Sequence, residues 1–461
     1  MKLIYNGNIV TSSEIFQGSV LIDGEKIKSV FRSVPVDISE NIEKIDATGK
    51  FIFPGFIDAH THFDLHVAGT VTCDDFESGT KAAISGGTTT IIDFGTQYPG
   101  ETLMQGLQNW FKKAEKVSCD YGIHMSITEW NEKISDECQL MMDEGVTTFK
   151  LYMTYDTKLN DKTIYKVLKR LKQVGGITGV HCENDGLIAA LQEEFSSASG
   201  APAFGGDVSC HYKTRPAAAE AEAIGRLLHL CEAAGCPVID VHLTCEEGLK
   251  EIRAARSRGQ IVYAETCPQY LTMTKDLYDL PGFEGAKYVI SPPLREKSDN
   301  DVLWKALADG EIQTVSTDHC AFTFSQKELG KNDFRKIPGG MPGVETRGEV
   351  IYSEGVAKGR ITASKMCEVL CENPAKLYGL YPRKGVISEG SDADIVILNP
   401  KRSKKITIEN QVSKCDYAPL EGKDINGVIE KVYLRGKLVA QDGKVISVGN
   451  GKFLKREAFN L

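Results

Sequence analysis

The sequence predicts an α/β protein: a (β/α)8 barrel of the TIM type that carries a small β-sandwich domain built from both ends of the chain. Three observations predict this fold. Apolar strand-like segments alternate with helical ones through the middle of the chain. Short strands joined by tight turns are found at both ends. The length of 461 residues is sufficient for one large domain and one smaller one.

The two ends of the chain share a pattern typical of β-hairpins. Near the N-terminus, SVLIDGEKIKSV alternates apolar and polar residues around Asp23 and Gly24, a pair that favours a tight turn. The C-terminal tail repeats this pattern in DADIVILNP and IEKVYLRGKLVAQDGKVI, with a second Asp-Gly pair at 442–443. We therefore expect residues 1–50 and 385–461 to form one β-sandwich domain.

The middle of the chain, residues 51–384, is expected to form the catalytic barrel. Helix-like segments separate its strands. In TRPAAAEAEAIGRLLHLCEAAG, Pro216 suits the first helical turn and apolar residues recur at helical spacing. Alternating strands and helices favour a parallel sheet, and eight such units favour a closed barrel. The expected strands are 51–60, 88–95, 121–128, 147–153, 176–183, 237–244, 261–267 and 312–319.

Composition and charge argue against several classes of function. The net charge of −9, with no run of Lys or Arg, argues against a surface for nucleic acid or for an anionic membrane. No apolar run approaches the ~20 residues that span a bilayer. The 13 cysteines are scattered without a CxxC pair, and the N-terminus lacks the apolar core of a signal peptide. Reduced thiols and a cytoplasmic location are therefore expected.

Nearly every expected strand of the middle region ends in a residue that can bind metal or move protons. The carboxyl ends of barrel strands converge on one mouth, where catalytic groups collect. Residues i and i+2 of a strand face the same side, so His60 and His62 can bind one ion together. Most of the remaining histidines are interpreted as structural. The residues that predict a metal site are His60, His62, Lys150, His181, His242 and Asp318.

Lys150 lies inside the apolar segment TTFKLYM and requires a separate argument. At its ordinary pKa of about 10.4 the amine is cationic and repels metal ions. Burial beside cations drives such an amine neutral, and a neutral amine can take up carbon dioxide to become a carbamate with two oxygen ligands. A carbamate at this position would bridge two ions, which together activate water and polarise a carbonyl. The alternative is a buried lysine that pairs with a carboxylate.

With these residues assembled, the chain resembles the amidohydrolase superfamily, and within it the hydantoinases, including the phenylhydantoinases, and the dihydropyrimidinases. The resemblance covers essentially the whole chain. The His-x-His pair or the GSDADIVI segment alone would indicate only the superfamily, whereas the full set is highly specific. The matching segments are GFIDAHTHFD, TCDDFESGTKAAISGGTTTIIDFGT, FKLYMTY, VHCEND, ETCPQYL, YVISPPLREK, STDHCAF and RKGVISEGSDADIVILNP.

The resemblance implies two divalent metal ions per subunit, usually zinc, although manganese, cobalt or iron can occupy similar sites. It also implies that Lys150 is N6-carboxylysine and ligates both ions. One ion would be held by His60, His62, Lys150 and Asp318, and the other by Lys150, His181 and His242.

The resemblance further implies a mechanism and a substrate class. A bridging hydroxide would open a hydantoin or dihydropyrimidine ring to an N-carbamoyl amino acid. Asp318 would act as general base and then carry a proton to the leaving nitrogen. Tyr155 would donate a hydrogen bond to the developing oxyanion, and the backbone at Ser291 would bind the imide or ureide edge of the ring. Relatives are commonly homotetramers, so a homotetramer or a dimer is expected.

Two positions bear on the choice of substrate. Relatives usually carry Pro-Asn-Gly where this chain has Pro338-Gly339-Gly340; the backbone contacts at Gly339 can persist, but substrate preference there can change. Dihydroorotases typically place an Arg where this chain has Asp64, which would repel a carboxylated substrate. An allantoinase, or a non-catalytic scaffold protein of the dihydropyrimidinase type, is the alternative reading.

Overall fold

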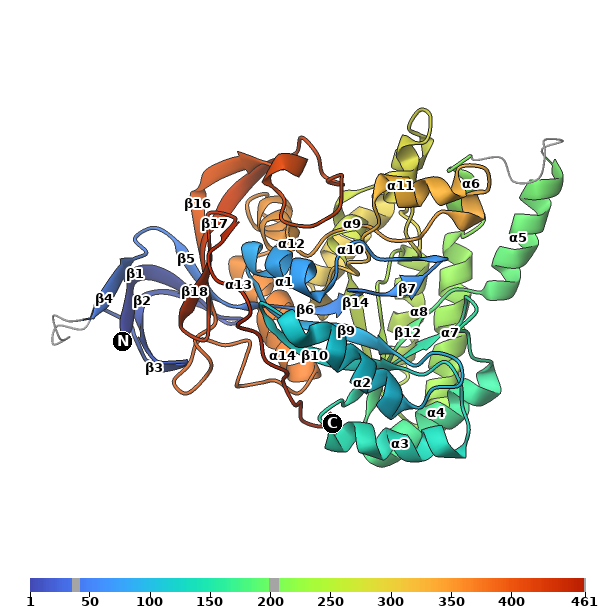
Figure 1. Cartoon of the computed structure of the whole chain (residues 1–461), viewed down its shortest axis with the longest axis horizontal. Coiled ribbons are helices and arrows are strands. Elements are labelled where there is room, and N and C mark those ends of the chain that lie inside the picture. The colour runs from blue at the N-terminus through green and yellow to red at the C-terminus, as the bar shows by residue number, and fades with distance from the viewer. Residues whose placement is uncertain (35–41, 199–206, 460–461) are drawn as a thin grey trace.

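The structure is a computed structural model that describes residues 1–34, 42–198 and 207–459. Two parts lie side by side: a barrel surrounded by helices, and a sheet that joins the two ends of the chain (Figure 1). This arrangement confirms the predicted fold class. Within the described residues, no helix has the length and apolar character needed to cross a membrane.

Eight parallel strands form the barrel, and each overlaps one of the expected segments. Their order around the sheet is β15, β14, β13, β12, β11, β10, β9 and β6. A parallel bridge between Thr61 and His319, just beyond β15, closes the ring. The strands are β6 (Phe56–Thr61), β9 (Thr88–Thr96), β10 (Asp120–Ser126), β11 (Thr148–Tyr152), β12 (Ile177–His181), β13 (Val238–Asp240), β14 (Val262–Thr266) and β15 (Thr314–Val315).

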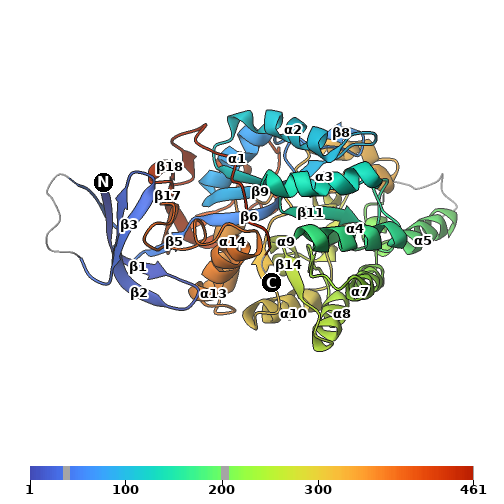
Figure 2. The ribbon, with the colours of Figure 1, turned by 90° about the horizontal axis from the view of Figure 1, so that it is seen from below.

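Helices cover the outside of the barrel, and Figure 2 shows α2, α3, α4, α7 and α8 around the strands. The helix expected after Pro216 is α7, which ends at Gly235 with a φ of 66°, a left-handed conformation that favours glycine. The apolar faces of these helices and the strands form the main core. The longer helices are α1 (Phe76–Ser85), α2 (Leu103–Lys113), α3 (Glu132–Asp143), α4 (Asp161–Val174), α5 (Asp185–Ala198), α7 (Ala217–Ala234), α8 (Glu246–Ser257) and α10 (Lys297–Ala308).

Short helices fill the loops of the barrel. The segment 324–327 is one of them and lies between the last barrel strand and the loop that contains Gly339. They are α6 (Cys210–Lys213), α9 (Pro268–Thr272), α11 (Phe324–Lys327), α12 (Arg347–Ile351), α13 (Ala363–Cys367) and α14 (Asn373–Leu377).

The two ends of the chain share one nine-stranded sheet with its own apolar core, separate from that of the barrel. Asp442 and Gly443 form the expected two-residue turn, both with positive φ. In the N-terminal hairpin the loop is Gly24 and Glu25, one residue later than the predicted pair, because Asp23 still pairs with Lys26. The strands are β1 (Lys2–Val10), β2 (Ile15–Asp23), β3 (Lys26–Phe31), β4 (Glu43–Asp46), β5 (Phe51–Pro54), β16 (Ile395–Lys405), β17 (Asp424–Leu434), β18 (Lys437–Gln441) and β19 (Lys444–Val445).

The segment 51–60, expected as one strand, is two strands in different sheets. β5 pairs with β1 and β16 in the terminal sheet, whereas β6 belongs to the barrel. The chain changes sheets at Gly55, where a Cβ atom would lie 2.1 Å from Oγ1 of Thr89, so only glycine fits. The prediction of one continuous strand over residues 51–60 was therefore wrong. The division of the chain into domains at about residues 50 and 385 stays a prediction.

Candidate active site

The predicted ligand residues lie at the carboxyl end of the barrel, where the strands place them around one mouth. Asp318 connects two of them: its Oδ1 atom lies 3.2 Å from Nε2 of His60 and 3.1 Å from Nε2 of His62. The ligand atoms of these three residues all lie within 4.8 Å of one another. The structure therefore brings together two imidazoles from β6 and its end with a carboxylate that follows β15.

The other predicted ligands continue this cluster across the mouth. The imidazole rings of His60 and His242 lie 5.5 Å apart between centroids, and those of His242 and His181 lie 4.6 Å apart. Lys150, in β11, is 1 % exposed, and its Nζ atom lies 4.9 Å from the centre of the Phe94 ring. Within the described part of the chain, Lys150 forms no ion pair with a carboxylate, the alternative that the sequence left open.

Burial controls the protonation of these groups. It lowers the pKa of Lys150 to about 8, against the opposing fields of Asp318 and Glu265. It lowers the pKa of His62 to about 4 and holds that of His242 well below its usual range. Burial alone would raise the pKa of Asp318, but the surrounding imidazoles, His60 first, hold it well below its ordinary value. Neutral imidazoles and an ionised carboxylate are the forms that bind metal ions.

Two acidic residues outside the predicted set orient the imidazoles. Nδ1 of His60 lies 2.6 Å from Oε1 of Glu265, so it donates its proton there and directs Nε2 toward Asp318. Nε2 of His181 donates to Glu183 at 2.7 Å, and Arg215 holds the same carboxylate at 2.6 Å. Glu265 is the last residue but one of strand β14, in YAETC, so the strand-end rule that found the ligands applies to it as well.

The donor set fits metal ions. Nε2 of His60, the nitrogen that faces Asp318, is buried and makes no hydrogen bond with any described residue. A buried imidazole nitrogen without a partner is costly in an apolar interior and is satisfied by a metal ion. Histidine nitrogens beside a carboxylate oxygen are ligands suited to zinc and related divalent ions.

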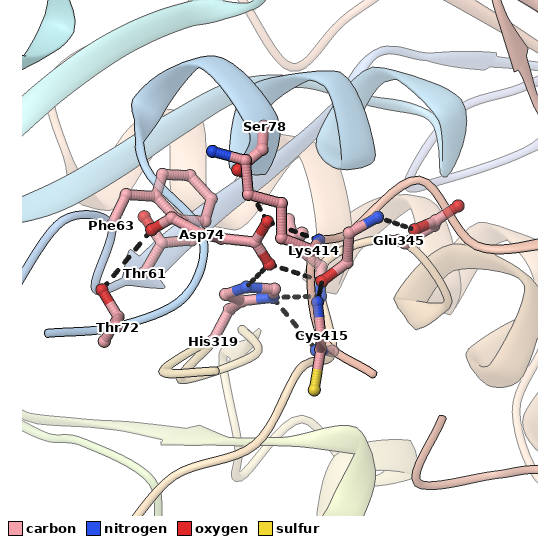
Figure 3. Close-up of polar contacts among 12 residues, drawn as sticks. Thr61, Phe63, Thr72, Asp74, Ser78, His319, Glu345, Lys414 and Cys415 are labelled. Atoms are coloured by element: carbon pink, nitrogen blue, oxygen red, sulfur yellow. Dashed lines mark hydrogen bonds and ion pairs between the residues drawn. The ribbon is translucent and has the colours of Figure 1, made fainter. Parts of the chain in front are cut away.

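His319, directly after Asp318, is held by protein groups (Figure 3). Its Nε2 donates to Asp74 at 3.1 Å, and its Nδ1 accepts from the backbone N–H of Gly343 at 3.1 Å. Asp74 also accepts the backbone N–H of Lys414 at 2.9 Å, which connects the barrel mouth to the C-terminal part of the chain. These bonds fix the backbone on which Asp318 is mounted, and they agree with a structural role for His319.

The predicted substrate-binding residues form a second group beside the imidazoles. Tyr155, with a φ of 72°, lies with its ring centre 4.9 Å from that of His181. Burial raises the pKa of the Tyr155 phenol, and the side chain of Ser291 opposes that rise. A Cβ atom on Gly339 would lie 3.6 Å from Oγ of Ser291, so these two backbone segments face each other. Three segments far apart in the sequence thus meet beside the candidate metal ligands.

Comparison with known proteins decides the family. A model of the amidohydrolase family matches residues 51–439. The chain belongs to the amidohydrolase family. This confirms the resemblance stated from the sequence and the prediction that the chain is an amidohydrolase enzyme. Members of this family typically depend on a pair of metal ions, in agreement with the cluster of His60, His62 and Asp318.

Relatives at about 40% identity extend over the full chain. A D-hydantoinase of Geobacillus stearothermophilus is 42% identical, and the match covers 99% of this chain and 97% of that protein. A D-phenylhydantoinase of Escherichia coli (strain SE11) is 40% identical over 99% of this chain and 98% of its own. The crystal structure of a dihydropyrimidinase from Brevibacillus agri NCHU1002 superposes with a TM-score of 0.96, at 41% identity, covering 100% of this chain and 99% of that one.

Proposed function

We propose that this protein opens the ring of a hydantoin or a dihydropyrimidine by hydrolysing a ring amide, which gives an N-carbamoyl amino acid. One observation carries the proposal: a metal-type cluster of His60, His62 and Asp318 adjoins a group of residues suited to bind a ring. The names of the relatives, two hydantoinases and a dihydropyrimidinase, support a small cyclic ureide or imide as substrate.

The proposed cofactor is a pair of divalent ions, zinc in the first instance, with manganese, cobalt or iron as alternatives. Lys150 would connect them as N6-carboxylysine. A pKa of about 8 supports this, because about a tenth of the amine is then neutral at pH 7 and able to react with carbon dioxide. The residues that would hold the ions are His60, His62, Lys150 and Asp318 for one, and Lys150, His181 and His242 for the other.

When bound, the two ions would polarise the ring carbonyl and lower the pKa of a bound water. Asp318 stays ionised at neutral pH, so it can take a proton from the attacking water. As the carbon–oxygen bond forms and the carbon–nitrogen bond breaks, Asp318 delivers that proton to the ring nitrogen. Tyr155 donates its hydroxyl proton in a hydrogen bond to the carbonyl oxygen as negative charge develops there. The backbone at Ser291 and Gly339 binds the imide or ureide edge.

The D configuration is the proposed stereochemical preference, on the strength of the D-specific names of both relatives. Asp64 supports a neutral ring over a carboxylated one because it supplies no cation to the loop after β6, and Lys113, 3.9 Å away, offsets the charge of its carboxylate. All 13 cysteines, each within the described residues, are free thiols, which supports the proposed cytoplasmic location. A homotetramer remains the proposed assembly, and light scattering of the purified protein tests it.

A substrate panel tests the proposed function. Hydantoin, D- and L-phenylhydantoin, dihydrouracil, allantoin and dihydroorotate are assayed with zinc or manganese added, and products are identified by mass. We expect the enzyme to open the ring of hydantoin or of dihydrouracil. We also expect it to open D-phenylhydantoin faster than L-phenylhydantoin. Preference for allantoin would establish the allantoinase alternative. A protein that binds no metal and opens no ring would establish the scaffold alternative.

A further inference from the structure

We propose that Lys327 is a positioning residue that sets the affinity for the ring by holding together the two backbone segments on either side of the substrate edge. This inference rests on the proposed function and deepens it. Lys327 ends the short helix α11 and is fully buried, with 0 % of its surface exposed. A lysine in such a place must be satisfied by specific partners, because an isolated charge is costly in the protein interior.

The partners of Lys327 are three backbone carbonyls. Its Nζ atom donates to the oxygen of Val289 at 2.9 Å, to that of Pro338 at 2.7 Å and to that of Gly340 at 2.6 Å. Burial lowers the pKa of Lys327 to about 7, and only its ammonium form has the three N–H groups that donate all three bonds at once. Hydrogen bonds from a charged donor are about twice as strong as those between neutral groups. The amine therefore acts as a three-point tie between chain segments.

These three carbonyls belong to the segments predicted to bind the ring. Val289 lies two residues before Ser291, and Pro338 and Gly340 flank Gly339. The segments also touch directly, because the N–H of Gly340 donates to the oxygen of Val289 at 2.9 Å. Lys327 thus sets the distance between the backbone groups of Ser291 and Gly339.

The sequence of the loop makes this tie more important. Gly339 has no side chain to fix its backbone, and among the described residues a Cβ atom there would meet only Ser291 within 4 Å. Gly340 adopts a φ of 148° and passes so close to Cys320 that a Cβ atom would lie 2.2 Å from its carbonyl oxygen. Two successive glycines give the backbone of this loop little conformational restraint. The hydrogen bonds from Lys327 therefore hold the loop in place. If these hydrogen bonds help to bind the substrate and the transition state equally, their loss raises KM and leaves kcat unchanged.

The experiment compares Lys327→Met with Lys331→Met, a matched control at an exposed lysine that pairs with Glu328. KM and kcat for hydantoin are measured on metal-loaded enzyme, together with metal content and thermal unfolding. For Lys327→Met we expect KM to rise about tenfold, kcat to change less than about twofold and two metal ions to remain. Lys331→Met should match the wild type. An added Gly339→Asn, which restores the side chain usual in relatives, should recover part of the lost affinity.

Two results would overturn the inference. One is an unchanged KM in Lys327→Met; the other is a fall in kcat and metal content together, which would mark Lys327 as a structural residue only. Should Lys327→Met fail to fold, Lys327→Gln keeps a similar side-chain volume and one amide donor group, and is judged by the same ratio of KM to kcat. A wild type that opens no ring in the panel would refute the proposed function, and this inference with it.

Discussion

Glu265 and His60 form a fully buried hydrogen bond of 2.6 Å at the barrel mouth, between β14 and β6, the two strands that flank β15. Because the carboxylate can only accept, Nδ1 of His60 carries the proton and Nε2 is left with its lone pair toward Asp318. The orientation of a candidate ligand on β6 is therefore set by an acid on β14.

Glu265→Gln should weaken metal binding about 10- to 100-fold, because the neutral amide holds the imidazole less firmly and makes it a poorer ligand. Metal affinity is measured by competition with a chelator, with zinc counted by elemental analysis. Glu311→Gln serves as the control, since Glu311 forms a 2.6 Å ion pair with Arg253 away from the mouth. An unchanged affinity in Glu265→Gln would contradict the orienting role.

Tyr155→Phe should lower kcat about 10²- to 10³-fold, the usual cost of losing one donor to a developing oxyanion. Metal content should not change, because the phenol is not among the proposed ligands. Tyr165→Phe is a matched control: Tyr165 lies on α4 and, like Tyr155, is 37 % exposed. A kcat within twofold of the wild type would remove Tyr155 from the proposed mechanism.

The stability of the terminal sheet should depend on pH through Glu430. Partial burial opposes its ionisation, but Lys50, Asn399 and Arg402 lower its pKa to about 2. In the unfolded chain its pKa is about 4.3, so the folded protein binds fewer protons, and stability is present above pH 4.3 and lost as the pH falls toward 2. After solvent screening, this contributes about 1 kcal/mol.

Glu430→Gln tests this dependence in the metal-free protein, where acid release of metal cannot interfere. Urea unfolding is followed from pH 7 to pH 3. The variant should be less stable than the wild type at pH 7, and the difference should shrink as the pH falls. A difference that is constant over this range would show that Glu430 does not titrate as proposed.

The candidate ligands at the strand ends were predictable because they depend on two local features, the two-residue period of a strand and the position at its end. His60, His62 and Asp318 were found by two rules: alternate residues of a strand share a face, and barrel strands end at one mouth. Both rules act over a few residues and need no knowledge of tertiary contacts. The eight barrel strands were found for the same reason, since apolar runs between helical segments are local signals.

Other features depend on contacts that no local pattern reports. The change of sheets at Gly55 follows from the approach of Thr89, a residue 34 positions further along the chain. Lys327 lies in a polar stretch, FSQKELGK, whose composition is typical of an exposed helix. It is buried because the segments near residues 289 and 339 pack over it. Such positions require the assembled fold.

Lys150→Ala should lose metal and activity together, because the proposed carbamate is the only side chain among the proposed ligands that both ions would share. Short carboxylates such as acetate or propionate should restore part of the activity, since they can place two oxygens in the space that the side chain leaves. Lys169→Ala, at an exposed position of α4, is the control. Full activity of Lys150→Ala without any additive would contradict the bridging role.

A carboxylated Lys150 is proposed to join two divalent ions at the mouth of the barrel. A crystal structure of the zinc-loaded enzyme, with anomalous data collected at the zinc edge, tests it most directly. We predict two anomalous peaks, one beside His60 and His62 and one beside His181 and His242, with carbamate density on Lys150 between them. An unmodified lysine, with one peak or none, would contradict the account.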